Sequence, residues 1–125
     1  MNKKIYTDKA PAAIGPYSQA VQAGNILYIS GMIPVDPATN TMAGTTIEEQ
    51  ASQIMRNIDA VLKEAGFCVD DVVKTTCFLA DMNDFARFNE VYADFFTSKP
   101  ARSCVAVKQL PKGALAEVET IAIKD

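Results

Sequence analysis

Arg102 and Glu117 are the two residues of this chain whose types and spacing best fit catalytic chemistry. Arg102 follows Pro100 and Ala101, and Glu117 stands fifteen positions later in a largely apolar segment. The planar guanidinium of arginine binds a carboxylate through two parallel hydrogen bonds, which lysine does not do. A nearby carboxylate can then direct a water molecule at the bound substrate. The alternative interpretations are a salt-bridged surface arginine and a solvated glutamate, and spacing alone does not bring the two residues together.

Cys104 and Glu119 extend this pattern, because alternate residues of a strand share a face. Arg102 and Cys104 are expected on one face of their strand, and Glu117 and Glu119 on one face of theirs. Cys104 fits a nucleophile poorly, since the chain contains no histidine to activate it. Cys104 is better interpreted as a small, buried, hydrophobic side chain.

The composition excludes several classes of site. Without histidine there is no Ser-His-Asp triad, no Cys-His pair and no imidazole metal site. The three cysteines form no CxxC pair, so a reducing, cytoplasmic compartment is expected. Helix capping or solvation explains the aspartates more simply than metal binding does, and we expect no metal and no cofactor. They are Asp70, Asp71, Asp81 and Asp84.

Charge and hydropathy narrow the possible partners. The formal net charge is -3, and no cluster of lysine and arginine stands out, so we expect neither nucleic acid nor an anionic membrane as partner. No apolar run approaches the length of a membrane span, and the N-terminus has no signal-peptide pattern. A small metabolite bound at a local positive site fits these properties.

Residues 17–31 predict a β-hairpin whose turn is Gly24-Asn25, a pair that tolerates positive φ. Extending the pairing from this turn places Tyr17 opposite Met32. Ser18 then stands opposite Gly31, so the far end of the hairpin gathers Tyr17, Ser30 and Gly31. The hydroxyl of Tyr17 can line a site there, although an interface tyrosine is an equally good interpretation.

Helical periodicity alternates with strand composition in the rest of the chain. Apolar residues at three- and four-residue steps predict helices over 45–65 and 85–96, the first with a capping-box pattern from Thr45 or Thr46 and a Gly66 stop. The second helix must end before Pro100, because proline interrupts a helix. Strands are expected at 4–6, 72–80, 102–108 and 117–123.

This order of elements predicts a single α+β domain over residues 1–125. The sheet should be mixed and mostly antiparallel, with two helices on one face. The other face would then carry exposed apolar side chains, and such patches usually mark an interface. We therefore expect a closed homo-oligomer that forms through the sheet.

Five blocks of the chain resemble the RidA/YjgF family of reactive-intermediate deaminases. They are residues 10–20 (APAAIGPYSQA), 29–37 (ISGMIPVDP), 75–85 (TTCFLADMNDF), 100–105 (PARSCV) and 110–112 (LPK). The resemblance implies a chorismate-mutase-like fold, assembled as a homotrimer with clefts between subunits. It also implies hydrolysis of enamines and imines, such as 2-aminoacrylate and 2-iminobutyrate, to 2-oxo acids and ammonia.

The resemblance also assigns roles by position. Arg102 corresponds to the family arginine that grips the substrate carboxylate, and Glu117 to the glutamate that positions the attacking water. The backbone of Gly31 and Cys104 completes the substrate contacts, and the remaining cleft-lining positions are Tyr17, Ser30 and Asn89. Two features depart from the pattern: Met32 replaces a common glutamine, and the connection over 97–100 is short.

Two other functions compete with this hypothesis. A non-catalytic sensor of small carboxylates would need Arg102 but not Glu117. Ribonuclease or translation inhibition has been attached to some relatives, but the acidic balance and the lack of basic-aromatic patches count against it.

Overall fold

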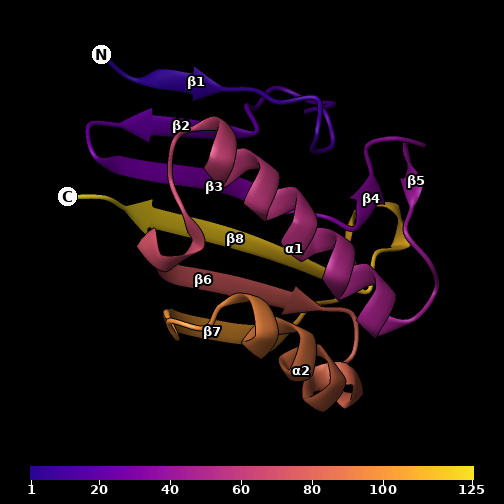
Figure 1. Cartoon of the computed structure of the whole chain (residues 1–125). Helices are drawn as coiled ribbons and strands as arrows, with labels where there is room; N and C mark the ends of the chain where they lie inside the picture. Colours follow the sequence, from indigo (N-terminus) through magenta and orange to yellow (C-terminus); the bar gives the residue numbers. More distant parts are fainter.

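The computed structural model describes the whole chain, residues 1–125, as one twisted sheet with two helices on one face (Figure 1). The six strands of the sheet follow the order β1-β2-β3-β8-β6-β7. All neighbours are antiparallel except β6 and β7, which are parallel. The bounds are β1 Lys3–Ile5, β2 Ala20–Ala23, β3 Ile26–Met32, α1 Ile47–Glu64, β6 Val72–Leu79, α2 Phe85–Phe95, β7 Ala101–Ala106 and β8 Ala116–Ile123. The predicted α+β fold with a mostly antiparallel sheet is confirmed.

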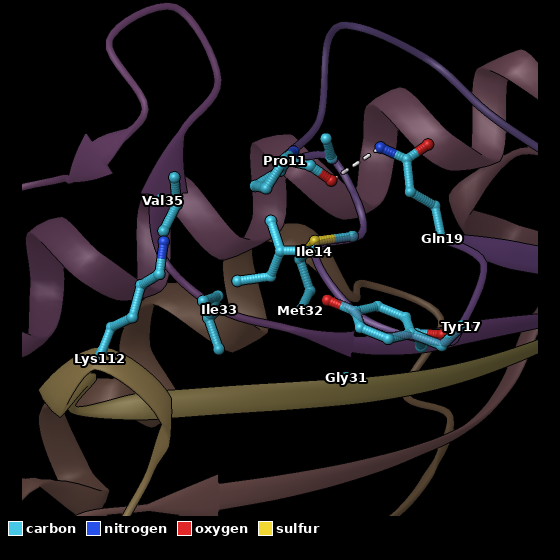
Figure 2. Close-up of a pocket in the computed structure, with 11 residues that line it drawn as sticks. Pro11, Ile14, Tyr17, Gln19, Gly31, Met32, Ile33, Val35 and Lys112 are labelled. Atoms are coloured by element: carbon cyan, nitrogen blue, oxygen red, sulfur yellow. Dashed lines mark hydrogen bonds between the residues drawn. The ribbon is translucent and has the colours of Figure 1, made fainter.

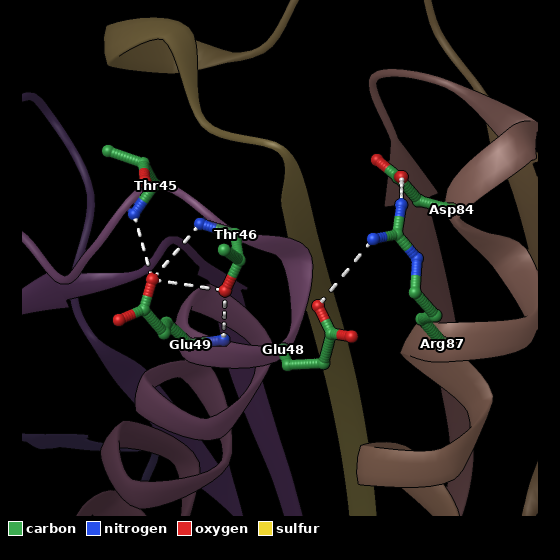
Figure 3. A network of polar contacts seen from close by, with 6 residues as sticks. All are labelled: Thr45, Thr46, Glu48, Glu49, Asp84 and Arg87. Carbon is green, nitrogen blue, oxygen red and sulfur yellow. Dashed lines mark hydrogen bonds and ion pairs between the residues drawn. The ribbon is translucent and has the colours of Figure 1, made fainter.

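Helix α1 forms where its local signals predict it. The Thr46 hydroxyl accepts from the Glu49 backbone N–H at 3.2 Å, and the Glu49 carboxylate accepts from the Thr46 backbone N–H at 3.2 Å (Figure 3). This capping box satisfies amide donors that the first turn of a helix otherwise leaves unpaired. Gly66 follows the helix at φ +80°, a conformation that favours glycine.

Helix α2 is the crossover that makes β6 and β7 parallel, since such a pair needs a long connection. Its beginning is tied to α1 by the side chain of Arg87, which lies 2.7 Å from Asp84 and 3.9 Å from Glu48 (Figure 3). These pairs are exposed and contribute little stability. The aromatic side chains of Phe88, Tyr92 and Phe96 are buried and anchor α2 on the sheet instead.

The two helices cover one face of the sheet and leave the other face open. Leu27, Cys77, Val118 and Ala122 face α1 and α2 and belong to a core of 23 buried residues. The other face has no helix over it (Figure 1). Its apolar side chains are only partly covered, and Tyr28 and Val105 are each 48% exposed. The expected uncovered sheet face is therefore present.

The predicted hairpin is correct near its turn and wrong at its far end. Ala23 pairs with Ile26 and Ala20 with Ile29, as expected. The pairing of Tyr17 with Met32 and of Ser18 with Gly31 does not form, because β2 begins only at Ala20. The chain before it is held by the buried side-chain amide of Gln19, which bonds to backbone groups of Thr7, Ala10 and Pro11.

Two short strands, β4 Val35–Asp36 and β5 Thr41–Met42, form a separate hairpin that the sequence pattern did not indicate. Two of the four aspartates act as turn caps: Asp71 accepts from the Cys68 N–H at 2.9 Å, and Asp81 from the Asn83 N–H at 2.8 Å. Asp84 instead pairs with Arg87. Neither helix has the length and continuous apolar character that crossing a bilayer requires.

Candidate active site

Arg102 lies on the edge strand β7, with its side chain on the helix face of the sheet. Its guanidinium carbon is 4.7 Å from the centre of the Tyr92 ring and 5.4 Å from that of Phe85. One guanidinium N–H donates to Oδ1 of Asn89 at 2.7 Å. None of the salt bridges in the structure includes Arg102. Its positive charge is therefore held in place without a carboxylate partner.

A cavity of about 340 Å³ opens beside this guanidinium. Its wall includes the connection 97–100, which follows α2. None of the residues that line it is acidic, so an anion would meet the positive charge of Arg102 without competition. They are Asn89, Tyr92, Ala93, Phe96, Thr97, Lys99, Pro100 and Arg102.

Cys104 is two residues along β7 from Arg102 and lies on the same face of the sheet, as predicted. It stands opposite Cys77 of β6. Burial raises the pKa of the Cys104 thiol, although Arg102 opposes the shift. Burial also raises the pKa of Cys77 to about 12. Both thiols are therefore protonated near neutral pH, which does not favour a thiolate nucleophile.

Glu117 lies on β8 and points to the open face of the sheet. It is only partly buried, and no side chain in the structure donates a hydrogen bond to its carboxylate or forms an ion pair with it. Burial raises the pKa of its carboxyl group above the ordinary value, and the charge of Glu119 raises it further. A carboxylate that has no partner and a raised pKa is a suitable acceptor for a proton from water.

The position of Glu117 depends on a β-bulge in the neighbouring strand β3. Ile29 pairs with Thr120 and Met32 with Val118, so two residues of β3, Ser30 and Gly31, oppose the single Glu119. A Cβ atom added at Gly31 would lie 2.8 Å from Cδ of Glu117. Glycine is thus required here for the carboxylate to approach the backbone.

A second cleft, of about 500 Å³, surrounds Glu117. Tyr17 is 52% exposed at its rim, and the Ser30 hydroxyl donates to the Ser18 carbonyl at 2.6 Å. The cleft brings together the predicted residues Tyr17, Ser30, Gly31 and Glu117. The full lining is Ile14, Tyr17, Ser30, Gly31, Ile33, Pro111, Lys112, Glu117 and Glu119.

Met32 does not line this cleft. Its side chain is 5% exposed and lies under the N-terminal segment, in a small recess next to Ile14 and Tyr17 (Figure 2). The Gln19 amide donates to the Pro11 carbonyl at 2.8 Å and fixes the segment over this recess. The departure from the common glutamine therefore changes the core behind the cleft rather than the cleft itself.

One chain does not bring Arg102 and Glu117 together. Strand β6 lies between β7 and β8, with Thr75 opposite Arg102 and Phe78 opposite Glu117. Residues three apart on a strand point to opposite faces. Arg102 is thus on the helix face and Glu117 on the open face, so each cleft contains only part of the predicted site.

Three residues around the site had not been singled out from the sequence. Tyr92 and Phe85 contact the guanidinium, but their helical spacing indicated only core positions. Lys112 lines the Glu117 cleft from the turn Pro111–Gly113, where its backbone has φ +57°. It also lines the recess that holds Met32 (Figure 2). No pattern in the sequence marks a non-glycine residue for this conformation.

Comparison with known proteins gives consistent matches along the whole chain. The family model described as Endoribonuclease L-PSP matches residues 7–124. The chain is 52% identical to a RutC family protein of Pyrococcus horikoshii, over 126 aligned positions that cover 100% of both chains. It is 48% identical to a 2-iminobutanoate/2-iminopropanoate deaminase of Salmonella typhimurium, with 99% of each chain covered.

A solved structure agrees with these sequence matches. TdcF of E. coli with bound serine superimposes with a TM-score of 0.95 at 43% sequence identity. The match covers 98% of this chain and 99% of TdcF. The serine complex shows that a protein of this fold binds a small amino acid.

Proposed function

Because this chain belongs to the RidA/YjgF family, we propose that it hydrolyses reactive enamines and imines to 2-oxo acids and ammonia. The substrate class is that of 2-aminoacrylate and 2-iminobutyrate. The observation that carries this proposal is the pair of unsatisfied charges: an arginine without a carboxylate partner and a glutamate without a cation partner. Each is free for a substrate, and the two have complementary roles.

The reaction needs orientation more than activation. The carboxylate of the substrate binds the Arg102 guanidinium, with backbone groups of Gly31 and Cys104 completing the contacts. Asn89, Ser30 and Tyr17 line the space around it. Once the imine nitrogen is protonated, its carbon is electrophilic, and a correctly placed water can add to it. Glu117 positions that water and accepts its proton.

The resulting amino alcohol then collapses. The nitrogen takes the proton that Glu117 accepted from the water, and the carbon–nitrogen bond breaks to release ammonia. The hydroxyl oxygen becomes the carbonyl of the 2-oxo acid as its proton passes to Glu117, which then loses that proton to solvent. The sum is imine plus water to 2-oxo acid plus ammonia, with no oxidation or reduction. No thiolate is involved, in agreement with the raised pKa of Cys104.

The site is completed by assembly in this proposal. The open face carries Glu117 beside exposed apolar side chains, while Arg102 is on the far face of the edge strand β7. A homotrimer packed through its sheets would place Arg102 of one subunit beside Glu117 of the next. The catalytic cleft would then be shared between two subunits, in the cytoplasm where the imines form.

Trapping of the imine tests the proposed activity. A pyridoxal-phosphate-dependent dehydratase generates 2-iminobutyrate, and semicarbazide competes with the protein for it. The wild-type protein should lower the amount trapped, and Arg102→Ala and Glu117→Gln should each reduce that effect by about two orders of magnitude or more. Arg87→Ala, which removes an exposed arginine outside both clefts, is the matched control. Full activity of Arg102→Ala would disprove the mechanism.

A sensor of small carboxylates is the second candidate, because the serine complex of TdcF shows binding without indicating turnover. It predicts that 2-oxobutanoate binds tightly, that trapping is unchanged by the wild-type protein, and that Glu117→Gln leaves binding intact. The same two measurements on the same variants therefore separate the two functions.

A further inference from the structure

The guanidinium of Arg102 rests on an aromatic ring that is itself fixed by a buried hydrogen bond. The ring is that of Tyr92, 4.7 Å from the guanidinium carbon. Its hydroxyl lies 2.6 Å from the Thr75 hydroxyl, and both side chains are buried. Phe96 packs against the same ring at 4.6 Å between centroids. The ring thus has a defined position and tilt.

We propose that Tyr92 and Thr75 are positioning residues that hold Arg102 ready for the substrate carboxylate without neutralising it. This inference rests on the proposed role of Arg102 in binding that carboxylate. The ring attracts the cation through its π-electrons, which fixes the guanidinium without forming an ion pair. The charge stays available, because a ring carries no negative charge of its own.

The register of the sheet supports this role for Thr75. Thr75 of β6 stands directly opposite Arg102 of β7 in the parallel ladder. The backbone of Arg102 and the anchor of the Tyr92 ring are therefore fixed by the same pair of strands. A shift of α2 along the sheet would therefore move the Tyr92 ring away from the guanidinium only by also breaking the bond to Thr75.

The protonation state of Tyr92 agrees with this role. Burial raises the pKa of the phenol above its ordinary value, although the bond to Thr75 opposes the shift. The hydroxyl therefore stays neutral over the physiological range. The side chains beneath and beside the guanidinium, from α2 and the adjoining turn, are two aromatic rings and the amide of Asn89, all of them uncharged.

Asn89 gives the sharpest test, because a single change turns its neutral acceptor into a carboxylate. In Asn89→Asp the new group would lie within hydrogen-bond distance of the guanidinium and form an ion pair with it. We expect the Kd for 2-oxobutanoate, measured by calorimetry near pH 7, to rise about tenfold or more. Affinity should recover as the pH falls and the new carboxyl is protonated. Asn89→Ala removes the same bond without a charge and should weaken binding less.

The ring and its anchor are tested by paired variants. Tyr92→Leu should raise the Kd for 2-oxobutanoate and the KM for 2-iminobutyrate about three- to tenfold, with a smaller change in kcat. Tyr92→Phe keeps the ring but loses the hydrogen bond to Thr75, so it should recover only part of the loss and bind like Thr75→Val. Thr75→Val removes the hydroxyl that bonds to Tyr92 and should weaken binding of 2-oxobutanoate. Thr75→Ser keeps this hydroxyl and should bind like the wild type.

Thr120 supplies a matched control for Thr75. It stands opposite Thr75 on β8, is 0% exposed, and its hydroxyl has no hydrogen-bond partner. Thr120→Val therefore makes the same chemical change at the same depth without touching the ring. Binding of 2-oxobutanoate by Thr120→Val should equal that of the wild type. An equal loss in Thr75→Val and Thr120→Val would mean that the hydroxyl acts only through general packing.

The possible failures are distinguishable. If Arg102→Ala still binds 2-oxobutanoate like the wild type, the proposed carboxylate grip is wrong. If Arg102→Ala abolishes binding while Tyr92→Leu and Asn89→Asp bind like the wild type, the grip stands and the positioning role is wrong. Should Tyr92→Leu fail to fold, Asn89→Asp and Thr75→Val decide the question, because these two changes preserve side-chain volume.

Discussion

Glu117 is partly buried beside Glu119 with no cation bonded to it, and this environment decides its protonation. The raised pKa means that the carboxylate form is lost at a higher pH than for an ordinary glutamate. The carboxylate is the form that accepts a proton from water. The burial that raises the pKa of Glu117 thus also brings it closer to the range that suits the base of the proposed mechanism.

This raised pKa predicts a pH profile. The kcat/KM for 2-iminobutyrate should fall on the acid side with an apparent pKa above the ordinary 4.5 of a glutamate. In Glu117→Gln the residual rate should show no such acid limb, because the titrating group is gone. Stopped-flow trapping between pH 4 and pH 8 measures both. An unchanged acid limb in Glu117→Gln would assign the titration to another group.

The same shift has a consequence for stability. Between the unfolded and the folded pKa the folded protein binds more protons, so the free energy of unfolding falls as the pH rises through this window. Glu117→Gln should therefore be more stable than the wild type at pH 7, by about 0.5 kcal/mol because solvent screens the partly exposed group. The difference should vanish below the ordinary pKa of glutamate. Urea unfolding at the two pH values provides the measurement.

Gly31 makes a separate prediction at the same scale. An alanine here would push its Cβ into the Glu117 carboxylate, which would have to rotate away from the position proposed for holding the water. A displacement of this kind can lower kcat by about a hundredfold. Ile26→Val, on the same strand and outside both clefts, is the control for effects on the strand. Turnover by Gly31→Ala near the wild-type rate would show that Glu117 tolerates a different position.

Helix α1 shows what local sequence determines. The capping box at Thr46 and Glu49, the apolar stripe and Gly66 all act within a few residues, and each is present in the structure where the pattern indicates it. The hydrogen bonds from Thr45 and Thr46 lower the pKa of Glu49, because they stabilise its ionised form. The contribution of Glu49 to helix stability is therefore present above its unfolded pKa and is lost as the pH falls.

The cap gives a prediction for this element. Thr46→Ala removes the hydroxyl that accepts from the Glu49 backbone N–H and should lower the free energy of unfolding by about 1 kcal/mol. Thr45→Ala is the matched control, because only the backbone N–H of Thr45 takes part in the network. Thermal unfolding compares the two variants. Faster amide exchange confined to the first turn of α1 would confirm the mechanism, and equal stability of the variants would contradict it.

Sheet pairing shows where local sequence is insufficient. Strands β7 and β8 are consecutive, and a simple hairpin between them would have placed Arg102 near Ala122 on an adjacent strand. Instead β6 inserts between them, so that Arg102 pairs with Thr75. This order depends on contacts between residues far apart in the sequence, which periodicity does not encode. The alternation of faces was predictable strand by strand, but the relative placement of the strands was not.

At the scale of the whole molecule, the two clefts lie on opposite faces of the sheet, and one of these faces has no helix over it. Arg102 and Asn89 form one half of the proposed site, and Glu117, Tyr17, Ser30 and Gly31 form the other. A chain that folds alone leaves the two halves on opposite faces. The exposed apolar side chains of Tyr28 and Val105 supply a reason for copies to associate through the sheet.

Mixing of two inactive variants tests this arrangement. Arg102→Ala and Glu117→Gln, unfolded together and refolded as a mixture, should regain activity if each cleft takes Arg102 from one subunit and Glu117 from another. Random assembly of equal amounts would restore about one quarter of the wild-type activity. Each variant refolded alone is the control. No recovery in a mixture of confirmed oligomers would place the whole site within one subunit.

The opposite orientation of Arg102 and Glu117 would also make the proposed catalysis subject to mass action. A newly folded chain would possess every residue of the proposed site and yet be inert until it met its copies. Specific activity should then depend on the concentration of the protein itself and fall on dilution below the dissociation constant of the assembly. The folding of one chain and the onset of its activity would be two separate events.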